Sequence, residues 1–435
     1  MKKSTLHHHP YWLEQLDAAP LLSERPPLNI DVLIVGAGYT GLSAAINTAR
    51  GGRSTVVVDA EDPGFGCSTR NGGQVSTSVK PSLEKLSIKF GEQKARAIRR
   101  EGVNALEWIG DFIGKEGLNC DFRRVGRFHA AHTPQHYDLL VKDAKKMQTS
   151  EGIESFVVTR ENQRSQLGTD AYFGGVVFPK HCSIHPAKYH REMLRLALAA
   201  DAEVVGHCRV TAIKKSSTGF LVNTTKGNVQ ARDVIIATNG YTSDLVPWLQ
   251  RRVIPIGSYI ITTEELPESK IEELFPGDRI ASDTCKVVYY YRATPDRKRV
   301  LFGGRVSASE TDLNTSAKRL YNDMCRIFPD LKDIKISHSW SGKVAYSFDE
   351  MAHTGVHDGI HYALGYCGSG VSMASYLGMR AGQKVLGLKE GITAFDDLRH
   401  PTRPLYTGKP WFLPAAVSYY RWQDKNQWDK ATKNG

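Results

Sequence analysis

The sequence has no long apolar run, and this excludes a helix that crosses a membrane. No stretch approaches the roughly 20 consecutive apolar residues that such a helix requires. The N-terminus carries two lysines with no apolar segment after them, which argues against a secretion signal. We also find no internal repeat and no low-complexity tract. The 435 residues are long enough for about two domains with a large core.

The cysteines lack the spacing of a metal site or a disulfide framework. There are seven, an odd number, and none forms a Cys-x-x-Cys pair. This usage favours a reducing compartment, so we expect a cytoplasmic protein. Three consecutive histidines, His7–His9, could bind a metal weakly, but we interpret them as part of a flexible terminal segment. We therefore predict no metal site.

The sequence also lacks a block of like charge. Its formal net charge is +11, which could indicate nucleic acid, an anionic membrane or an acidic substrate as partner. Lys and Arg are dispersed along the chain, however, and this favours a solvated basic surface. We expect no nucleic-acid partner.

The sequence does contain a glycine-rich turn between a strand and a helix. The apolar residues 30–35 predict a buried strand, and the small residues 42–46 predict a helix. Between them, Gly36 allows a tight turn, Gly38 allows the backbone to approach a pyrophosphate, and Gly41 allows the helix to pack close to the strand. Free N–H groups at the start of this helix favour a negatively charged ligand.

A second predicted strand, residues 55–58, ends at Asp59. A carboxylate at this position can accept hydrogen bonds from a ribose 2′-OH, which favours FAD or NAD over NADP. Another strand–glycine–helix pattern follows at 361–371, with a helix to about 388. An extended dinucleotide needs one contact for its adenosine and another for its reactive ring, so this pair of turns favours a flavoprotein.

The remaining patterns predict a mixed α/β chain. Helices are predicted at 82–118, 134–149 and 187–200, a hairpin at 220–222 and 229–231, and strands of a second sheet at 253–263 and 286–305.

A set of motifs, in order, resembles the D-amino-acid oxidase, glycine oxidase and sarcosine oxidase family of FAD enzymes, above all its γ-glutamylputrescine oxidase branch. The most specific motif is Arg70-Asn71-Gly72-Gly73-Gln74. The motifs lie at 36–45, 64–74, 237–241, 290–292, 302–304, 340–342 and 365–371. The resemblance implies an α/β fold of two domains, a Rossmann-like FAD-binding domain and a mixed-sheet substrate domain. We predict an irregular segment at 1–28, the FAD-binding domain at 29–90, 181–252 and 343–435, and the substrate domain at 91–180 and 253–342.

The resemblance also implies a set of residues around FAD. Asp59 would hold the ribose, the glycines of the first turn the pyrophosphate, the 68–74 loop the flavin ring, and the turn before the last helix the pyrimidine end of that ring. The full set is Gly36, Gly38, Tyr39, Thr40, Gly41, Asp59, Ala60, Gly66, Cys67, Ser68, Arg70, Asn71, Gly72, Gly73, Gln74, Val210, Ala237, Thr238, Asn239, Gly240, Gly342, Gly368, Ser369, Gly370, Val371 and Ser372. We predict non-covalent FAD, because the stretch that carries the attaching cysteine in sarcosine oxidases reads Val344-Ala345-Tyr346-Ser347.

The resemblance implies oxidation of a C–N bond in an amine. A hydride moves from the carbon beside the amine nitrogen to the flavin, the imine is hydrolysed to an aldehyde, and O2 is reduced to H2O2. The predicted catalytic residues are Lys343, Tyr291 and Trp340, with Lys343 helping to activate oxygen. The predicted substrate-binding residues are Tyr290, Arg292, Arg305, Tyr346 and His353. Strand alternation puts Tyr289 and Tyr291 on one face and Tyr290 and Arg292 on the other, and only one face can line the pocket.

Other functions stay open. The favoured substrate is a γ-glutamylated or otherwise carboxylate-bearing amine. The main alternative is a membrane-associated FAD dehydrogenase of a cyclic or N-alkylated amino acid that passes electrons to a quinone. Its only support is the aromatic, basic tail 411–422, which we expect to pack on the FAD-binding domain instead. A flavoprotein that acts on tRNA and a flavin-binding protein without catalysis are further alternatives.

Overall fold

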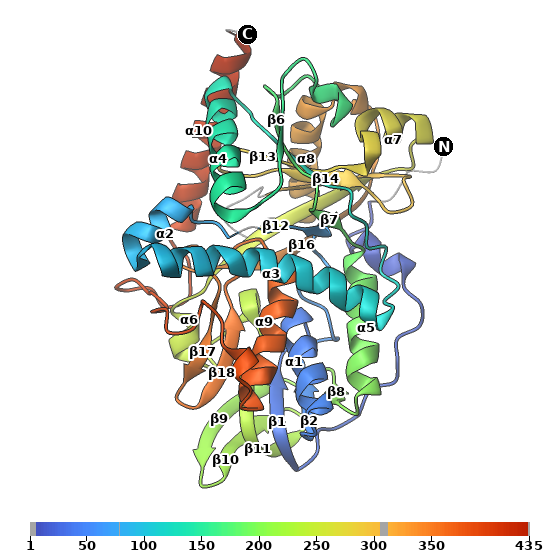
Figure 1. The fold of residues 1–435 in the computed structure, drawn as a ribbon. Coiled ribbons are helices and arrows are strands. Elements are labelled where there is room, and N and C mark those ends of the chain that lie inside the picture. The colour runs from blue at the N-terminus through green and yellow to red at the C-terminus, as the bar shows by residue number, and fades with distance from the viewer. Residues whose placement is uncertain (1–5, 78, 305–311, 434–435) are drawn as a thin grey trace.

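Two large β-sheets organise the chain, one in each half of the molecule (Figure 1). The structure is a computed structural model, and it describes residues 6–77, 79–304 and 312–433. It confirms the predicted α/β class. A third, short sheet pairs β3 (Gln74–Val75) with β7 (Cys182–Ser183).

The first sheet is built around parallel strands. Its order is β17-β18-β11-β1-β2-β8, and β10 joins β9 to the edge of β11. The strands are β1 (Asn29–Val35), β2 (Thr55–Val58), β8 (Glu203–Val205), β9 (Val210–Ser216), β10 (Gly219–Thr224), β11 (Gly227–Ile236), β17 (His353–His357) and β18 (Ile360–Leu364). β1 pairs in parallel with β2 and β11, and β11 pairs in parallel with β18, so their carboxyl ends meet at one edge. The apolar runs suit this sheet because helices cover it.

Helices cover this sheet and position its loops. Figure 1 shows α1, α5 and α9 side by side over the strands, with the long α3 crossing them. The α-helices of the described chain, on either sheet, are α1 (Tyr39–Arg50), α2 (Leu83–Phe90), α3 (Glu92–Glu116), α4 (Pro134–Glu151), α5 (Pro186–Ala199), α6 (Pro247–Gln250), α7 (Glu268–Leu274), α8 (Leu313–Ile327), α9 (Gly370–Val385) and α10 (Leu413–Lys433). The predicted helix 82–118 is two helices, because Gly91 between them has φ +80°. The predicted helices at 134–149 and 187–200 and the hairpin are confirmed.

The second sheet is mostly antiparallel. Its order is β16-β12-β15-β14-β13-β4-β6-β5, with β13 and β4 parallel. The strands are β4 (Arg127–Ala130), β5 (Phe156–Val158), β6 (Gly175–Phe178), β12 (Ile254–Thr263), β13 (Ile280–Asp283), β14 (Tyr290–Ala293), β15 (Val300–Gly304) and β16 (Ile336–Tyr346). One face carries Tyr291 and Phe302 into a core with α8. The other face carries Leu301 and Trp340 toward the N-terminal segment, where they pack with Trp12.

Two helices belong to different cores from those that their sequence positions suggest. Residues 91–180 are predicted as substrate domain, but α3 buries Ala95, Ile98 and Ala105 in the core formed by α1 and α9. The tail is predicted to pack on the FAD-binding domain. Instead Leu413 and Val417 of α10 pack with Ile254 and Ile256 of β12, and Trp428, further along α10, lies in the core of the second sheet. Asp424 accepts hydrogen bonds there from the backbone N–H groups of 286 and 287 at 2.9 and 2.8 Å. An amphipathic pattern shows that a helix has a buried face, but not which core receives it.

The N-terminal segment is ordered rather than flexible. A 3-10 turn at Tyr11–Gln15 buries Tyr11 and Trp12. His7 forms a parallel bridge with His338 of β16. The interpretation of His7–His9 as flexible is therefore wrong, because apolar anchors after this run fix the segment.

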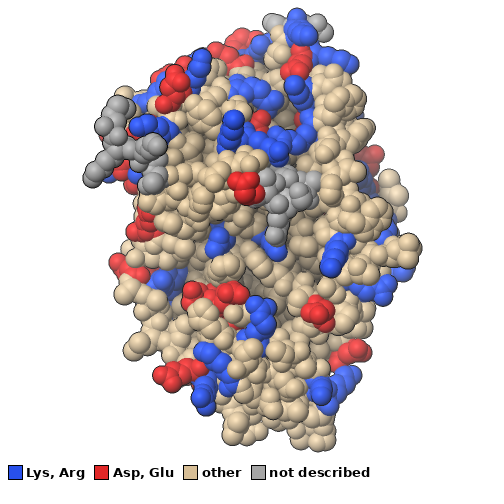
Figure 2. Space-filling view, turned by 180° about the vertical axis from the view of Figure 1, so that it is seen from behind, with Lys and Arg blue, Asp and Glu red and all other residues tan. Residues whose placement is uncertain are grey.

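The surface shows charges of both signs. On the face in Figure 2, lysine and arginine side chains gather around a hollow in the upper part, and over the rest of the face they are interspersed with aspartate and glutamate. Among the described residues, no helix combines the length and the apolar character needed to cross a bilayer. The seven cysteines, all of them described, are free thiols.

Candidate active site

Four loops converge at the carboxyl edge of the first sheet. They follow β1, β2, β11 and β18 at residues 36–41, 59–61, 237–240 and 365–371. In open α/β sheets the crevice at this edge is the usual ligand site, because the loops leave space between the strand ends. The four segments contain fifteen of the residues predicted to hold FAD; the other predicted positions are in the 64–74 loop, at the start of β9, on β16 and in the first turn of α9.

The first glycine loop has no room for a side chain at any of its three glycines. Gly36 has φ +104°, and a Cβ there would lie 2.9 Å from the Ala237 carbonyl oxygen. A Cβ on Gly41 would lie only 1.9 Å from the Gly36 carbonyl oxygen. On Gly38 it would lie 2.8 Å from Ser68 Oγ. At these three glycines the loop therefore has no side chain, and a pyrophosphate that approaches the backbone closely requires this.

Polar side chains hold this loop in place. The Ala37 N–H donates to Asp59 Oδ2 at 2.7 Å, and the Tyr39 N–H donates to Ser68 Oγ at 3.0 Å. His190 Nε2 donates to the Ala37 carbonyl at 2.7 Å. Burial raises the pKa of Asp59, and the hydrogen bonds from Ala37 and Glu61 oppose that shift. Asp59 Oδ1 accepts from the Glu61 N–H at 3.0 Å. The Asp59 carboxylate therefore holds the glycine loop by hydrogen bonds, and Asp59 is also the residue predicted to contact the ribose.

A second helix begins beside the first. α9 follows Ser369, its N-cap residue, and packs closely along α1. A Cβ on Gly378 would lie 2.3 Å from the Thr40 carbonyl oxygen, so the two backbones nearly touch. Thr40 Oγ1 and Tyr366 Oη form a hydrogen bond of 2.7 Å between the two turns. Because both helices follow parallel strands, their N-termini lie at the same edge of the sheet and favour an anionic ligand there.

The 64–74 loop, called here the flavin loop after the role predicted for it from the sequence, has its own internal hydrogen bonds. Asn71 Nδ2 donates to the carbonyls of Cys67 and Ser68 at 3.0 and 3.1 Å, and Asn71 Oδ1 accepts from the Gly73 N–H at 2.8 Å. Arg70 Nε donates to the Phe65 carbonyl at 2.6 Å. The Arg-Asn-Gly-Gly motif is therefore a folded turn stabilised by its own side chains.

Three distant side chains also donate to carbonyls of the flavin loop. Trp340 Nε1 donates to the Arg70 carbonyl, and Trp12 Nε1 donates to the Asn71 carbonyl, both at 2.9 Å. Arg292 Nη1 donates to the Gly73 carbonyl at 3.0 Å. The loop is thus fastened to the second sheet and to the N-terminal segment.

The predicted catalytic residues have three different environments. Trp340 is fully buried against the flavin loop. Lys343 is exposed on β16, while its backbone carbonyl accepts from Cys67 Sγ at 3.0 Å. Tyr291 packs in the core of the second sheet, stacks on Phe302 and donates to Tyr172 Oη at 2.9 Å. Strand alternation therefore turns Tyr291 away from the flavin loop and removes it from the candidate site.

The opposite face of β14 meets the flavin loop. A Cβ on Gly72 would lie 2.8 Å from the Tyr290 ring, and Tyr290 Oη hydrogen-bonds Ser258 Oγ at 2.9 Å. Arg292 is 2% exposed and also donates to the Ile184 carbonyl at 3.0 Å. It therefore links the backbone at Gly73 to the backbone at Ile184 by hydrogen bonds, rather than facing a cavity. Burial lowers the pKa of Arg292 to about 9.

The other predicted substrate residues are spread over the fold. Tyr346, on β16, lies beside the α9 turn, and a Cβ on Gly368 would be 3.3 Å from its Oη. His353 is 1% exposed, hydrogen-bonds Asp349 at 2.9 Å and stacks on His400, which is a structural environment. Arg305 lies outside the described residues.

Several predicted cofactor positions form tight junctions between these loops. A Cβ on Gly66 would lie 2.9 Å from the Tyr241 ring, and one on Gly342 would lie 2.8 Å from Cys67 Sγ. A Cβ on Gly240 would lie 2.3 Å from the Lys343 carbonyl oxygen. Burial raises the pKa of the Cys67 thiol to about 12, so it stays protonated at neutral pH. Glycine at these positions therefore allows the loops to pack directly on one another.

The sequence analysis missed two residues that shape this site. Trp12 lies in a segment predicted to be irregular, and only its aromatic character distinguishes it there. His190 sits inside α5 and reaches the glycine loop only through the fold. His185, in contrast, caps α5 by accepting from the Lys188 N–H at 3.1 Å, as a residue at a helix start does.

Comparisons with known proteins agree with this geometry. The family of FAD dependent oxidoreductases called DAO matches residues 31–383. The chain is 31% identical to the γ-glutamylputrescine oxidoreductase of Escherichia coli over 417 residues, which cover 94% of this chain and 96% of the relative. It is 28% identical to the probable oxidoreductase OrdL of Haemophilus influenzae over 92% of this chain and 94% of the relative. Among solved structures, glycine oxidase from Geobacillus kaustophilus superposes with a TM-score of 0.73 at 16% identity, covering 87% of this chain and 99% of that one.

Proposed function

Because the chain belongs to the DAO family of FAD-dependent oxidoreductases, we propose that it oxidises the C–N bond of a carboxylate-bearing amine of the γ-glutamylputrescine type. The family establishes an FAD-dependent oxidoreductase that acts on amines or amino acids. The narrower substrate class is supported by the 31% identity to the γ-glutamylputrescine oxidoreductase, which extends over nearly the full length of both chains.

FAD supplies the two-electron acceptor, so the protein has only to bind, orient and deprotonate the amine. The substrate carbon loses a hydride, the resulting imine takes up water, and an aldehyde and ammonia leave. An ammonium group cannot release this hydride, because its nitrogen has no lone pair. We propose that Tyr290 and Trp340, which pack against the flavin loop, exclude water from the amine and thereby favour its neutral form.

Anaerobic absorbance spectroscopy tests the substrate class. The purified protein is titrated with γ-glutamylputrescine, and separately with sarcosine, D-alanine and pipecolate. We expect γ-glutamylputrescine to bleach the flavin band at the lowest concentration. Putrescine without the glutamyl group is the matched control, and it should bleach the band poorly because it lacks the carboxylate. Equal bleaching by both amines would contradict the proposed recognition of a carboxylate.

We propose O2 as the electron acceptor, with Lys343 as the positive charge that assists its reduction. The Lys343 side chain is exposed, and the Lys343 backbone carbonyl accepts a hydrogen bond from Cys67 of the flavin loop. After anaerobic bleaching, air is admitted and the recovery of the flavin band and the release of H2O2 are followed. Lys343→Met should slow recovery in air but leave anaerobic bleaching unchanged. Lys343→Arg, which keeps the charge, should restore the recovery rate.

A dehydrogenase that delivers electrons to a membrane quinone is the second candidate. One observation favours it: Trp411, Tyr419 and Trp422 in and before α10 are 73, 57 and 63% exposed. In this case the bleached flavin would persist in air and recover with a soluble quinone. Binding to lipid vesicles that depends on Trp411 and Trp422 would support this candidate further. Cytoplasmic location and non-covalent FAD stay predictions, and release of FAD on acid precipitation would test the latter.

A further inference from the structure

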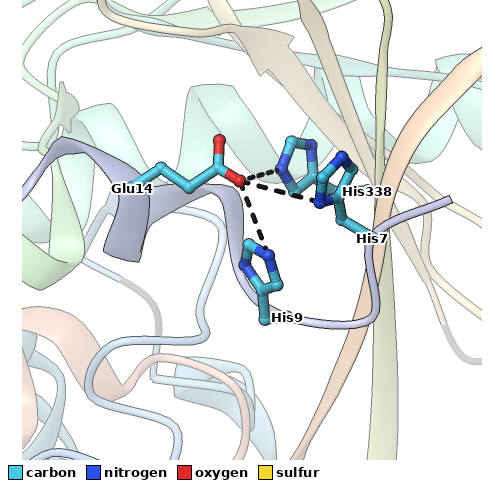
Figure 3. Close-up of side chains that lie close together, drawn as sticks. All are labelled: His7, His9, Glu14 and His338. Atoms are coloured by element: carbon cyan, nitrogen blue, oxygen red, sulfur yellow. Dashed lines mark hydrogen bonds and ion pairs between the residues drawn. The ribbon is translucent and has the colours of Figure 1, made fainter. Parts of the chain in front are cut away.

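A cluster of three histidines and one glutamate lies where the N-terminal segment meets β16 (Figure 3). His7, His9 and Glu14 come from the N-terminal segment, and His338 comes from β16. Glu14 Oε1 is 2.9 Å from His338 Nε2, 3.5 Å from His9 Nε2 and 4.0 Å from His7 Nδ1. Figure 3 shows all three rings turned toward this one oxygen.

We propose that this cluster is a structural site for a divalent transition metal of the Zn2+ type. Three imidazoles and a carboxylate are a ligand set that such ions prefer. A tetrahedral ion with bonds of about 2.0–2.1 Å holds its ligand atoms about 3.3 Å apart. The four ligand atoms already lie within 4.8 Å of one another, so small side-chain rotations complete the coordination. Four protein ligands fill the coordination sphere, as is typical of a structural rather than a catalytic site.

A hydrogen bond behind His338 prepares this ring to bind a cation. His338 Nδ1 lies 2.9 Å from Ser337 Oγ. The Ser337 hydroxyl donates its single proton to the Thr263 carbonyl at 2.7 Å, so it accepts from the His338 Nδ1–H. Nε2 then faces Glu14 Oε1 at 2.9 Å, and its lone pair becomes available to a metal ion once the ion displaces the proton that these two atoms share. Metal-binding histidines have such a partner on the second ring nitrogen, because it fixes the tautomer that binds.

Backbone hydrogen bonds bring the ligands together. The His7 N–H donates to the Ser337 carbonyl at 2.8 Å, and the Ser339 N–H donates to the His7 carbonyl at 2.9 Å. These bonds set His7 beside His338, and their rings stack with centroids 4.8 Å apart. The 3-10 turn at 11–15 then returns Glu14 to the same point. The site is thus largely preformed.

The metal would fasten the segment that supports the flavin loop. The turn that carries Glu14 also carries Trp12, whose indole donates to the flavin loop, and β16 carries Trp340, which does the same. A metal bound by Glu14 and His338 links these two supports directly. Metal binding should therefore stabilise the fold and the retention of FAD, although it takes no part in the oxidation.

The test uses untagged, full-length holoprotein that has been treated with a chelator and then dialysed. Co2+ is titrated and its tetrahedral absorption bands, which lie at longer wavelength than the flavin bands, are recorded. Zn2+ bound per chain is measured by mass spectrometry. We expect one ion per chain, competition between Zn2+ and Co2+, and a rise in Tm of roughly several degrees at saturating Zn2+.

Neighbouring histidines provide a matched pair of variants. His8 lies outside the cluster and its Nε2 hydrogen-bonds Asn314 Oδ1 at 3.0 Å, so His8→Ala should leave metal affinity unchanged. His9→Ala should weaken binding by more than about tenfold, because it removes a ligand. If His8→Ala weakens binding as much as His9→Ala, the proposed ligand set is wrong.

Two further variants distinguish metal binding by the whole cluster from metal binding by His7–His9 alone. Glu14→Gln and His338→Ala remove ligands that lie outside this run, and both should abolish the tetrahedral cobalt spectrum. Unchanged binding in both variants would overturn the proposal, because the histidine run alone would then account for it. Absence of any binding by wild-type protein at equimolar Zn2+ would overturn it as well. His338 is buried, so Glu14→Gln decides the outcome if His338→Ala does not fold.

Discussion

The glycine loop at 36–41 and the flavin loop at 64–74 lie in one crevice but are held by different means. In the glycine loop, the constraint is contact between nearby backbones, such as the 1.9 Å that a Cβ on Gly41 would leave to Gly36. In the flavin loop, the constraint comes from donors that are distant in sequence, namely Trp12, Trp340 and Arg292. The first loop is held by elements of its own half of the molecule, among them His190 of α5, whereas the second also requires that the two halves be assembled.

This difference implies different responses to substitution. A side chain added to the glycine loop meets backbone atoms that cannot move without unfolding the strand–helix unit. A donor removed from around the flavin loop leaves a carbonyl without its partner, and the cost is that of one or two hydrogen bonds. Four predictions test this contrast.

Gly41→Ala should have the largest effect. Its Cβ would overlap the Gly36 carbonyl, so we expect a loss of more than about 4 kcal/mol in the free energy of unfolding, together with loss of FAD. Gly114→Ala in α3 is the control, because no atom lies within 4 Å of the added Cβ, and it should stabilise by about 0.5–1 kcal/mol. Urea unfolding and the ratio of flavin to protein absorbance measure both variants. Retention of FAD by Gly41→Ala would contradict the close packing of this loop.

Arg292→Met should have the next largest effect. The guanidinium is buried and donates to the carbonyls of Gly73, Ile184 and Ala293. Loss of these charged donors should cost about 3 kcal/mol and weaken FAD binding. Arg100→Met, which breaks an exposed ion pair with Glu107, should change stability by less than about 0.5 kcal/mol. Similar unfolding midpoints in urea for the two variants would contradict the role of the Arg292 hydrogen bonds in stabilising the fold.

Mild acid should destabilise the protein through its buried histidines. Burial lowers the pKa of His185 and of His190 to about 4, whereas an unfolded chain titrates near 6.5. Between these values the unfolded state binds more protons, so stability falls as pH decreases from about 6.5 toward 4. At pH 5 each such histidine costs about 2 kcal/mol.

Unfolding free energies at pH 7.5 and pH 5 test this prediction. His190 donates to the glycine loop, so FAD should be released over the same range. His190→Gln should reduce the dependence of stability on pH, because glutamine does not titrate. A stability that stays constant from pH 7 to pH 5 would show that these imidazoles are accessible to protons in the folded protein.

Trp12→Phe and Trp340→Phe should have the smallest effects. Each removes one indole N–H that donates to the flavin loop and keeps most of the apolar contact, so we expect a loss of about 1 kcal/mol each and weaker FAD binding. Trp411→Phe, at an exposed position, should be neutral. Thermal unfolding and equilibrium dialysis of FAD measure the three variants. Equal FAD affinity in all three variants would show that the two indole N–H groups do not support the flavin loop.

Local patterns predicted a large part of the fold. The run of strand, glycine turn and helix at the start of the chain is observed as predicted, and so is the second such unit before α9. These elements depend on neighbouring residues: glycine where φ is positive or backbones touch, and apolar runs where a parallel strand is buried. The break at Gly91 was missed because the apolar spacing continues across it.

Assignments that depend on distant residues were less predictable. Alternation along β14 separated Tyr291 from Tyr290 but left open which face meets the flavin loop, and packing against α8 decided it. Arg292 was predicted to meet a substrate carboxylate, yet its donors are used by backbone carbonyls. Periodicity defines the faces of an element, and only the layer packed against each face gives that face its role.

The sequence by itself determined the strand–glycine–helix unit at the edge of the first sheet, because its glycines, Asp59 and the strand–helix alternation act through contacts between residues close in the chain or in paired strands. Only the tertiary structure decided that α3 joins the first core, that α10 joins the second, and that Trp12 supports the flavin loop. It also brought His338 to His7, His9 and Glu14. The physical reason is that these contacts join residues that are far apart in the sequence, from 59 positions for Trp12 and Asn71 upward, and no local preference of the chain specifies such partners.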